Sequence, residues 1–233
     1  MSRKYTLTYH EASSPITTLT TKFGGQPNWL EAPRWPLSRM YGRPMQFICQ
    51  IAVDPALFGD LPARMAYVFM TDWDYKSAYP ESFAPDRGEN ALVLQPGGLW
   101  DGPFLPVHEG PSLYRRFYRS GRWEQTPCEF TVELRSGDDS DGGVWDRYPQ
   151  EDAAQEAYWA ALLEDKVGGT PVPTPFGRRF GADFDGWRLL LQLNAKDNAV
   201  EETDPFFLNM ASDAVIYAFI SVDGRRGKVL WER

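Results

Sequence analysis

Cysteine and histidine are scarce in this sequence, which has two of each in 233 residues. Cys49 and Cys128 lie far apart in apolar stretches, so they predict buried thiols rather than a zinc site or a redox pair. His10 and His108 fall in none of the HExxH, GxSxG, P-loop or GxGxxG patterns that mark common catalytic and nucleotide sites. The sequence therefore predicts no catalytic residues, no bound metal and no cofactor.

Long apolar runs and an excess of basic residues are also missing. No run reaches the roughly 18 apolar residues of a membrane span, and the N-terminus lacks the apolar core of a secretion signal, so we expect a cytoplasmic protein without membrane contact. The formal net charge of −8 disfavours general binding to nucleic acid, because phosphates attract lysine and arginine. One segment, 113–123 (LYRRFYRSGRW), interleaves arginines with aromatic residues and keeps nucleic acid as a minor alternative.

Three short blocks occur twice and in the same order. The segment 22–27 (KFGGQP) returns at 166–171 as KVGGTP. Each is followed by an apolar run around one glutamine, which is FICQI with Gln50 in the first case and LLLQL with Gln192 in the second. The related runs AYVFM and IYAFI come next at nearly the same spacing. We interpret these blocks as an internal duplication.

The local patterns predict a fold made mostly of antiparallel strands. The apolar runs are short and bounded by turn residues, which is typical of buried strands, whereas 129–134 (EFTVEL) alternates like a half-exposed strand. One amphipathic helix is predicted over 151–165. The expected fold class is therefore α+β, a single domain over 1–233 in which the copies 16–72 and 160–224 share one core around a pseudo-two-fold axis.

Acidic residues concentrate in residues 137–165, which we call the acidic joint because it would connect the two copies. From Asp138 to Asp165 there are nine acidic residues and one basic residue, Arg147. Such a local field attracts a basic protein, and aromatic side chains in the same segment can anchor it. The residues predicted to bind a partner are Asp138, Asp139, Asp141, Trp145, Asp146, Tyr148, Glu151 and Asp152.

Several of these motifs resemble those of the YwqG-like family, a bacterial domain of unknown function. The match rests on 22–27, on Trp35 and Pro36 before 42–45 (GRPM), on 88–91 (GENA) and on 217–231. The first half is also distantly similar to the programmed-cell-death-2 group, whose members shield a basic ribosomal protein, although the cysteine-rich inserts of that group are absent here. The resemblance implies no known catalytic residues. Because some YwqG-like proteins are encoded beside secreted toxins, it implies an immunity role.

Together these features predict a non-catalytic protein-binding module, an immunity protein that neutralises a co-encoded secreted toxin through its acidic surface. A first alternative is a small-ligand binder or enzyme with a cleft between the two halves, on which Lys22, Gln50, Lys166 and Gln192 would converge. A second alternative is a chaperone-like shield for a basic protein. The four repeat side chains also have a structural interpretation, in which they satisfy buried backbone groups where strands cross.

Overall fold

The computed structural model describes residues 2–139, 149, 151–177, 180, 184–201 and 203–233. Strands make up 40% of the chain and helices 7%, so the fold is mostly antiparallel β and the α+β expectation holds only in part. The named helices in the described ranges are short, α1 (Pro55–Phe58) and α2 (Asp152–Leu162). No helix in these ranges is long and apolar enough to cross a membrane.

Ten strands form one sheet in the order β14-β13-β12-β11-β1-β10-β2-β4-β5-β6, and each neighbouring pair is antiparallel. In chain order the strands are β1 (Ser2–Glu11), β2 (Lys22–Gly24), β4 (Gln46–Ala52), β5 (Met65–Met70), β6 (Asn90–Gln95), β10 (Glu129–Asp139), β11 (Lys166–Gly168), β12 (Trp187–Asn194), β13 (Val215–Ser221) and β14 (Gly227–Glu232).

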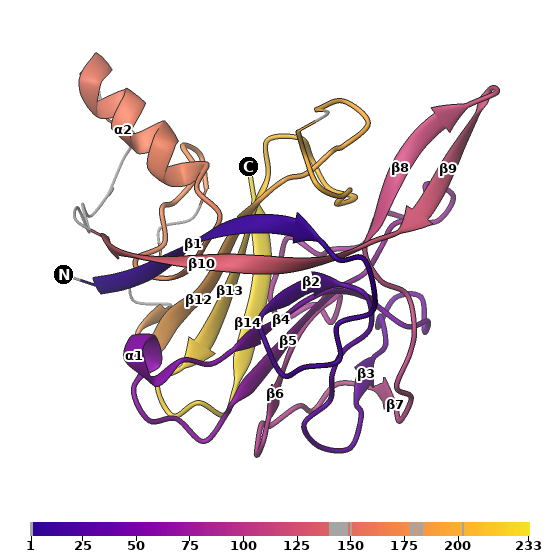
Figure 1. The fold of residues 1–233 in the computed structure, drawn as a ribbon, viewed down its shortest axis with the longest axis horizontal. Helices are drawn as coiled ribbons and strands as arrows, with labels where there is room; N and C mark the ends of the chain where they lie inside the picture. The colour runs from indigo at the N-terminus through magenta and orange to yellow at the C-terminus, as the bar shows by residue number, and fades with distance from the viewer. Residues whose placement is uncertain (1, 140–148, 150, 178–179, 181–183, 202) are drawn as a thin grey trace.

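The sheet curves into a nearly closed barrel, and we call the line where β6 meets β14 the seam (Figure 1). The amide Nδ2 of Asn90 on β6 donates to the carbonyl oxygen of Val229 on β14 at 3.1 Å. Gly227 lies so close to Leu92 that a Cβ there would be 2.4 Å from the leucine Cβ. The two strands therefore meet through side-chain packing and single hydrogen bonds rather than through a regular ladder.

Smaller elements decorate the barrel. A two-stranded sheet pairs β3 (Trp35–Pro36) with β7 (Phe104–Leu105). A hairpin pairs β8 (Tyr114–Arg119) with β9 (Arg122–Pro127) and projects at the upper right of Figure 1, whereas α2 projects at the upper left.

The predicted strands and the predicted helix are confirmed in their positions. FICQI lies in β4, AYVFM in β5, LLLQL in β12 and IYAFI in β13, and nearly all of their side chains are buried. The half-exposed strand predicted over 129–134 is the first part of β10, which extends to Asp139 because it pairs with β1 from Phe130 onward. The helix predicted over 151–165 is α2, slightly shorter at both ends.

Three hydrophobic clusters stabilise the barrel. The largest contains residues from both halves, such as Ile51 and Ile216, so both halves contribute to one core. A second cluster around Tyr158 and Phe219 includes side chains of α2 and of β12 to β14. A third, around Trp35, includes side chains of β4 to β6.

Both thiols are buried in the largest cluster, and we expect them to be chemically protected. Burial raises the pKa of the Cys49 thiol well above its usual value and that of Cys128 to about 12. Because the thiolate is the reactive form, folded protein at pH 8 should react with a disulfide reagent such as DTNB on the order of 100-fold more slowly than protein unfolded in guanidinium. Equal reaction rates of the folded and unfolded protein would contradict this burial.

Candidate functional site

The glutamine of the first repeat, Gln50 on β4, bonds to the chain just before and just after the neighbouring strand β2. We call this arrangement a strand crossing. Its side chain is 0% exposed. Its Oε1 accepts from the backbone N–H of Asn28 at 2.8 Å, and its Nε2 donates to the carbonyl oxygen of Thr20 at 2.8 Å. The hydroxyl of Tyr67, which is directly opposite Gln50 on β5, donates to the carbonyl oxygen of Asn28 at 2.8 Å.

The glutamine of the second repeat, Gln192, makes the matching contacts. Its Oε1 accepts from the backbone N–H of Val172 at 3.0 Å, and its Nε2 donates to the carbonyl oxygen of Glu164 at 3.3 Å and to two carbonyls at the end of α2. Tyr217, opposite Gln192 on β13, donates to the carbonyl oxygen of Val172 at 2.6 Å. The register of β12 with β13 also shifts one step before the glutamine, as that of β4 with β5 does.

The lysines of the two motifs are buried beside carboxylates. Lys22 and Lys166 are each 1% exposed. The ammonium of Lys22 donates to Glu129, and that of Lys166 lies 3.5 Å from Asp139 and donates to the carbonyl oxygen of Thr170 at 2.8 Å. Burial lowers the pKa of both lysines, and the neighbouring carboxylates oppose that shift.

The backbone conformation of the motif requires glycine. Gly24 has φ +69° and Gly168 has φ +76°, a region that side chains with a Cβ rarely adopt. A Cβ on Gly24 would also lie 2.2 Å from the carbonyl oxygen of Cys128. The lysines and glutamines of the repeats thus lie in the interior with their polar atoms bonded internally, so they do not face an open cleft.

The described part of the acidic joint divides into exposed and internal residues. Asp138, Glu151 and Asp152 are exposed. Asp139 accepts from the backbone N–H of Thr170, so its carboxylate is already used inside the protein. The other predicted partner-binding residues lie outside the described residues, and these are Asp141, Trp145, Asp146 and Tyr148.

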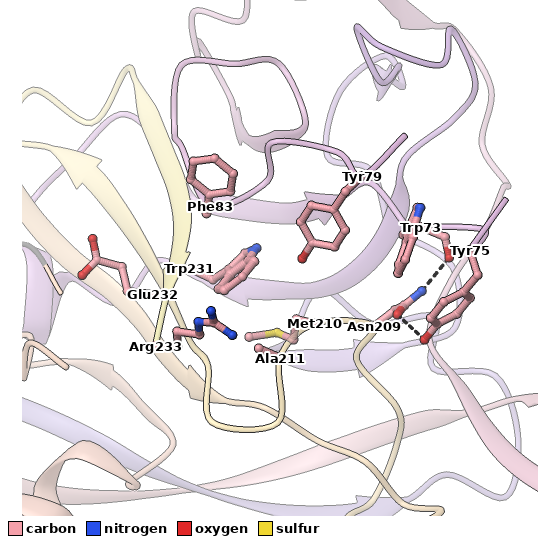
Figure 2. Close-up of a pocket in the computed structure, with 10 residues that line it drawn as sticks. All are labelled: Trp73, Tyr75, Tyr79, Phe83, Asn209, Met210, Ala211, Trp231, Glu232 and Arg233. Atoms are coloured by element: carbon pink, nitrogen blue, oxygen red, sulfur yellow. Dashed lines mark hydrogen bonds between the residues drawn. The ribbon is translucent and has the colours of Figure 1, made fainter. Parts of the chain in front are cut away.

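An open cleft lined by aromatic rings lies where the loop after β5 meets the loop before β13 and the end of β14. We call it the aromatic cleft, and its volume is about 650 Å³. Figure 2 shows aromatic rings along one side and Arg233, Met210 and Asn209 along the other. Its aromatic side chains are Trp73, Tyr75, Tyr79, Phe83 and Trp231.

The rings of the aromatic cleft contact one another but remain accessible. The Trp73 centroid lies 4.5 Å from that of Tyr75 and 5.1 Å from that of Tyr79. Phe83 packs edge-on against Trp231 at 6.3 Å. Tyr75, Tyr79 and Phe83 are nevertheless 58%, 41% and 43% exposed, so three large rings face solvent at one place.

Local hydrogen bonds fix the loop that carries these rings. The carboxylate of Asp74 accepts from the backbone N–H groups of Ser77 and Lys76, and these bonds hold the pKa of Asp74 below its usual range. The indole N–H of Trp73 donates to the carbonyl oxygen of Ser77 at 2.9 Å. Tyr75, with φ +60°, turns the chain between them.

Asn209 connects this loop to the second half of the chain. Its Nδ2 donates to Asp72 Oδ1 at 2.9 Å and to the carbonyl oxygen of Trp73 at 2.6 Å. Its Oδ1 accepts from the hydroxyl of Tyr75 at 2.5 Å (Figure 2). The cleft is therefore held in shape before any ligand arrives, which reduces the entropy lost on binding.

The aromatic cleft has few ionisable side chains. Its remaining polar lining is Glu232 and Arg233. Neither His10 nor His108 lines it; both are exposed elsewhere. Within the described ranges, no group of three or more His, Cys, Asp or Glu side chains is arranged to hold a metal ion.

The basic and aromatic segment 113–123 supplies the whole of β8, the turn and the start of β9. Arg116 is held by Asp197 at 2.9 Å and lies over the rings of Trp123 and Phe207, so the acids of the chain itself pair with part of this segment. Tyr118 and Trp123 remain 63% and 52% exposed. The hairpin thus adds a second exposed aromatic surface.

One sequence feature could have predicted part of the aromatic cleft. Residues 72–83 (DWDYKSAYPESF) place four aromatic residues within a short polar stretch with turn residues, which suits neither a buried strand nor a solvated loop. No sequence pattern links this stretch to Asn209 or Trp231.

Comparison with known proteins identifies no relative, since no family model matches the chain and no curated protein matches it at a significant level. The YwqG-like resemblance therefore stays a prediction.

Proposed function

We propose that this protein is a non-catalytic protein-binding module and that the aromatic cleft is the centre of its binding surface. The observation that carries the proposal is the set of three exposed rings, Tyr75, Tyr79 and Phe83, on a loop held in place by internal hydrogen bonds. Tyrosine and tryptophan dominate the energetics of protein interfaces because they bury large areas with few rotatable bonds.

Charge supports a basic partner. Glu151 and Asp152 begin α2, and Glu156, Trp159 and Leu163 follow on its exposed side, with Trp159 40% and Leu163 59% exposed. An acidic helix of this kind speeds the encounter with a cationic surface, while aromatic anchors provide most of the affinity. The resemblance to the YwqG-like family supports a secreted toxin as that partner, which makes the protein an immunity protein. A basic client shielded before assembly is the alternative within the same class.

Neutralising the start of α2 is expected to slow association with a basic partner. In the variant Glu151→Gln/Asp152→Asn, the association rate at low salt should fall about threefold or more, because two exposed negative charges at the start of α2 are lost. The difference should shrink at high salt, since screening removes the same field. Stopped-flow or surface plasmon resonance measures both effects.

The matched control is Asp60→Asn/Glu124→Gln. It also removes one aspartate charge and one glutamate charge, but from the turn after α1 and from β9. This control should leave the association rate within the experimental error. If the two double variants behave alike, the charge of the acidic joint does not steer the partner.

We also infer that the chain is an internal duplication with a pseudo-two-fold axis. Support comes from the matching contacts of Gln50 and Gln192 and from the identical pairing of each with a tyrosine. The sheet order supports it as well, because β1, which precedes the first copy, pairs with β11 of the second, and β10, which precedes the second copy, pairs with β2 of the first. Such an exchange explains why the halves share a core and would not fold separately.

A further inference from the structure

A second pocket lies at the seam, between the loop that precedes β6, the loop that follows it and the start of β14. Its volume is about 700 Å³, within the range of small-molecule sites. It is separate from the aromatic cleft, with which it shares no lining residue. We call it the seam pocket.

The seam pocket is lined by four cationic side chains in a chain whose net charge is −8. These are Arg34, Arg39, Arg226 and Lys228, and none of them forms an ion pair with a described residue. Asp86 and Asp101 also line the pocket, so four positive charges face two negative ones. Cations gathered in one concave place without a carboxylate partner among the described residues create a local positive potential.

The GENA stretch, residues 88–91, builds one wall of this pocket. The buried carboxylate of Glu89 accepts from Ser38 Oγ at 2.6 Å and from the backbone N–H of Met40 at 2.8 Å, which fixes the loop that carries Arg39. Gly88 has φ +80°, and a Cβ there would lie 3.0 Å from the Cβ of Arg39. Glycine at this position therefore lets Arg39 lie against the loop.

Two buried polar atoms of the lining have no partner among the described residues. They are Oδ1 of Asn90, whose residue is 3% exposed, and Nε1 of Trp100. Buried polar atoms usually have hydrogen-bond partners, and leaving one without a partner is unfavourable. Both residues line the pocket with the four cations, but the two atoms are covered, so a ligand reaches them only when the side chains that cover them move.

We propose that the seam pocket binds a phosphate-bearing small molecule. Arginine matches phosphate oxygens with paired, charge-assisted hydrogen bonds, and Arg34, Arg39 and Arg226 supply three such groups. The N–H of Trp100 suits a further anionic oxygen, and Asn90 Oδ1 suits a hydroxyl or amino group of the ligand. The ligand therefore carries both a phosphate and a hydrogen-bond donor, as nucleotides and sugar phosphates do.

Isothermal titration of the full chain tests the proposal with inorganic phosphate, pyrophosphate, ribose 5-phosphate and ATP as probes. At least one phosphate ester should bind more tightly than inorganic phosphate, and the ester preferred distinguishes a nucleotide from a sugar phosphate. Arg39→Gln and Arg226→Gln should each weaken binding about tenfold. Trp100→Phe keeps the ring and removes the donor, so it should weaken binding while circular dichroism stays unchanged.

The control Arg64→Gln/Arg122→Gln removes two exposed arginines elsewhere and should bind as the unmodified protein does. Binding of no probe at about 1 mM, which is weaker than about −4 kcal/mol, would overturn the proposal. Unchanged affinity in the arginine variants would overturn it as well. Variants of the aromatic cleft should leave this affinity unchanged, so the outcome is independent of the protein-binding proposal.

Discussion

Replacing Gln192 by leucine is expected to lower the free energy of unfolding by about 3 kcal/mol. Leucine has a similar size but leaves the backbone N–H of Val172 and the carbonyls at the end of α2 without their partner. The N–H of Val172 and the carbonyl of Leu162 are too deep to gain water in exchange. Urea denaturation monitored by tryptophan fluorescence measures the loss.

The same change at Gln50 should cost a similar amount, because it removes the matching contacts with Asn28 and Thr20. Gln125→Leu on the exposed strand β9 is the control, and its effect should stay within about 0.5 kcal/mol. If Gln192→Leu is as stable as this control, the crossing does not depend on the glutamine. If only one repeat variant is destabilised, the equivalence of the two crossings is wrong.

Removing two rings of the aromatic cleft is expected to weaken partner binding about 30-fold, which corresponds to about 2 kcal/mol. The variant Tyr79→Ala/Phe83→Ala removes side chains that are 41% and 43% exposed, so the fold should be retained. The effect should appear mainly in the dissociation rate, since anchors act after encounter. The partner is first isolated from the source cells with the unmodified protein as bait, and its affinity is then measured.

Phe104→Ala is the matched control, because Phe104 on β7 is also 43% exposed but lies outside the aromatic cleft. It should bind the partner as the unmodified protein does. Equal affinity of all three proteins would show that the exposed rings of the cleft do not anchor the partner.

The strands could be predicted because their signal is local. Runs such as FICQI and LLLQL are apolar and are bounded by turn residues. This local pattern is sufficient to predict the positions of β4 and β12. The pairing of β1 with β11 and of β10 with β2 has no local signal. It depends on which strand edges of the sheet are still unpaired when the other strands have paired. The sequence of a single segment does not contain that information.

Site residues are harder to predict because side-chain partners come from distant parts of the chain. A count of acids cannot tell that Asp139 is bonded to the backbone of Thr170 whereas Asp138 is exposed. Likewise, the loop of Tyr79 becomes a cleft only where Asn209 and Trp231 meet it. The repeated lysines and glutamines were the clearest motif, and the buried strand crossings account for them.

Hydrogen–deuterium exchange on the complex with the isolated partner tests most directly whether the aromatic cleft is the binding site. Exchange reports backbone protection segment by segment, so it locates the contact without any substitution. The proposal predicts slower exchange in residues 73–83 and 209–211 when the partner is bound, with β3 and β7 unchanged. Unaltered exchange in both cleft segments, with protection elsewhere, would contradict it.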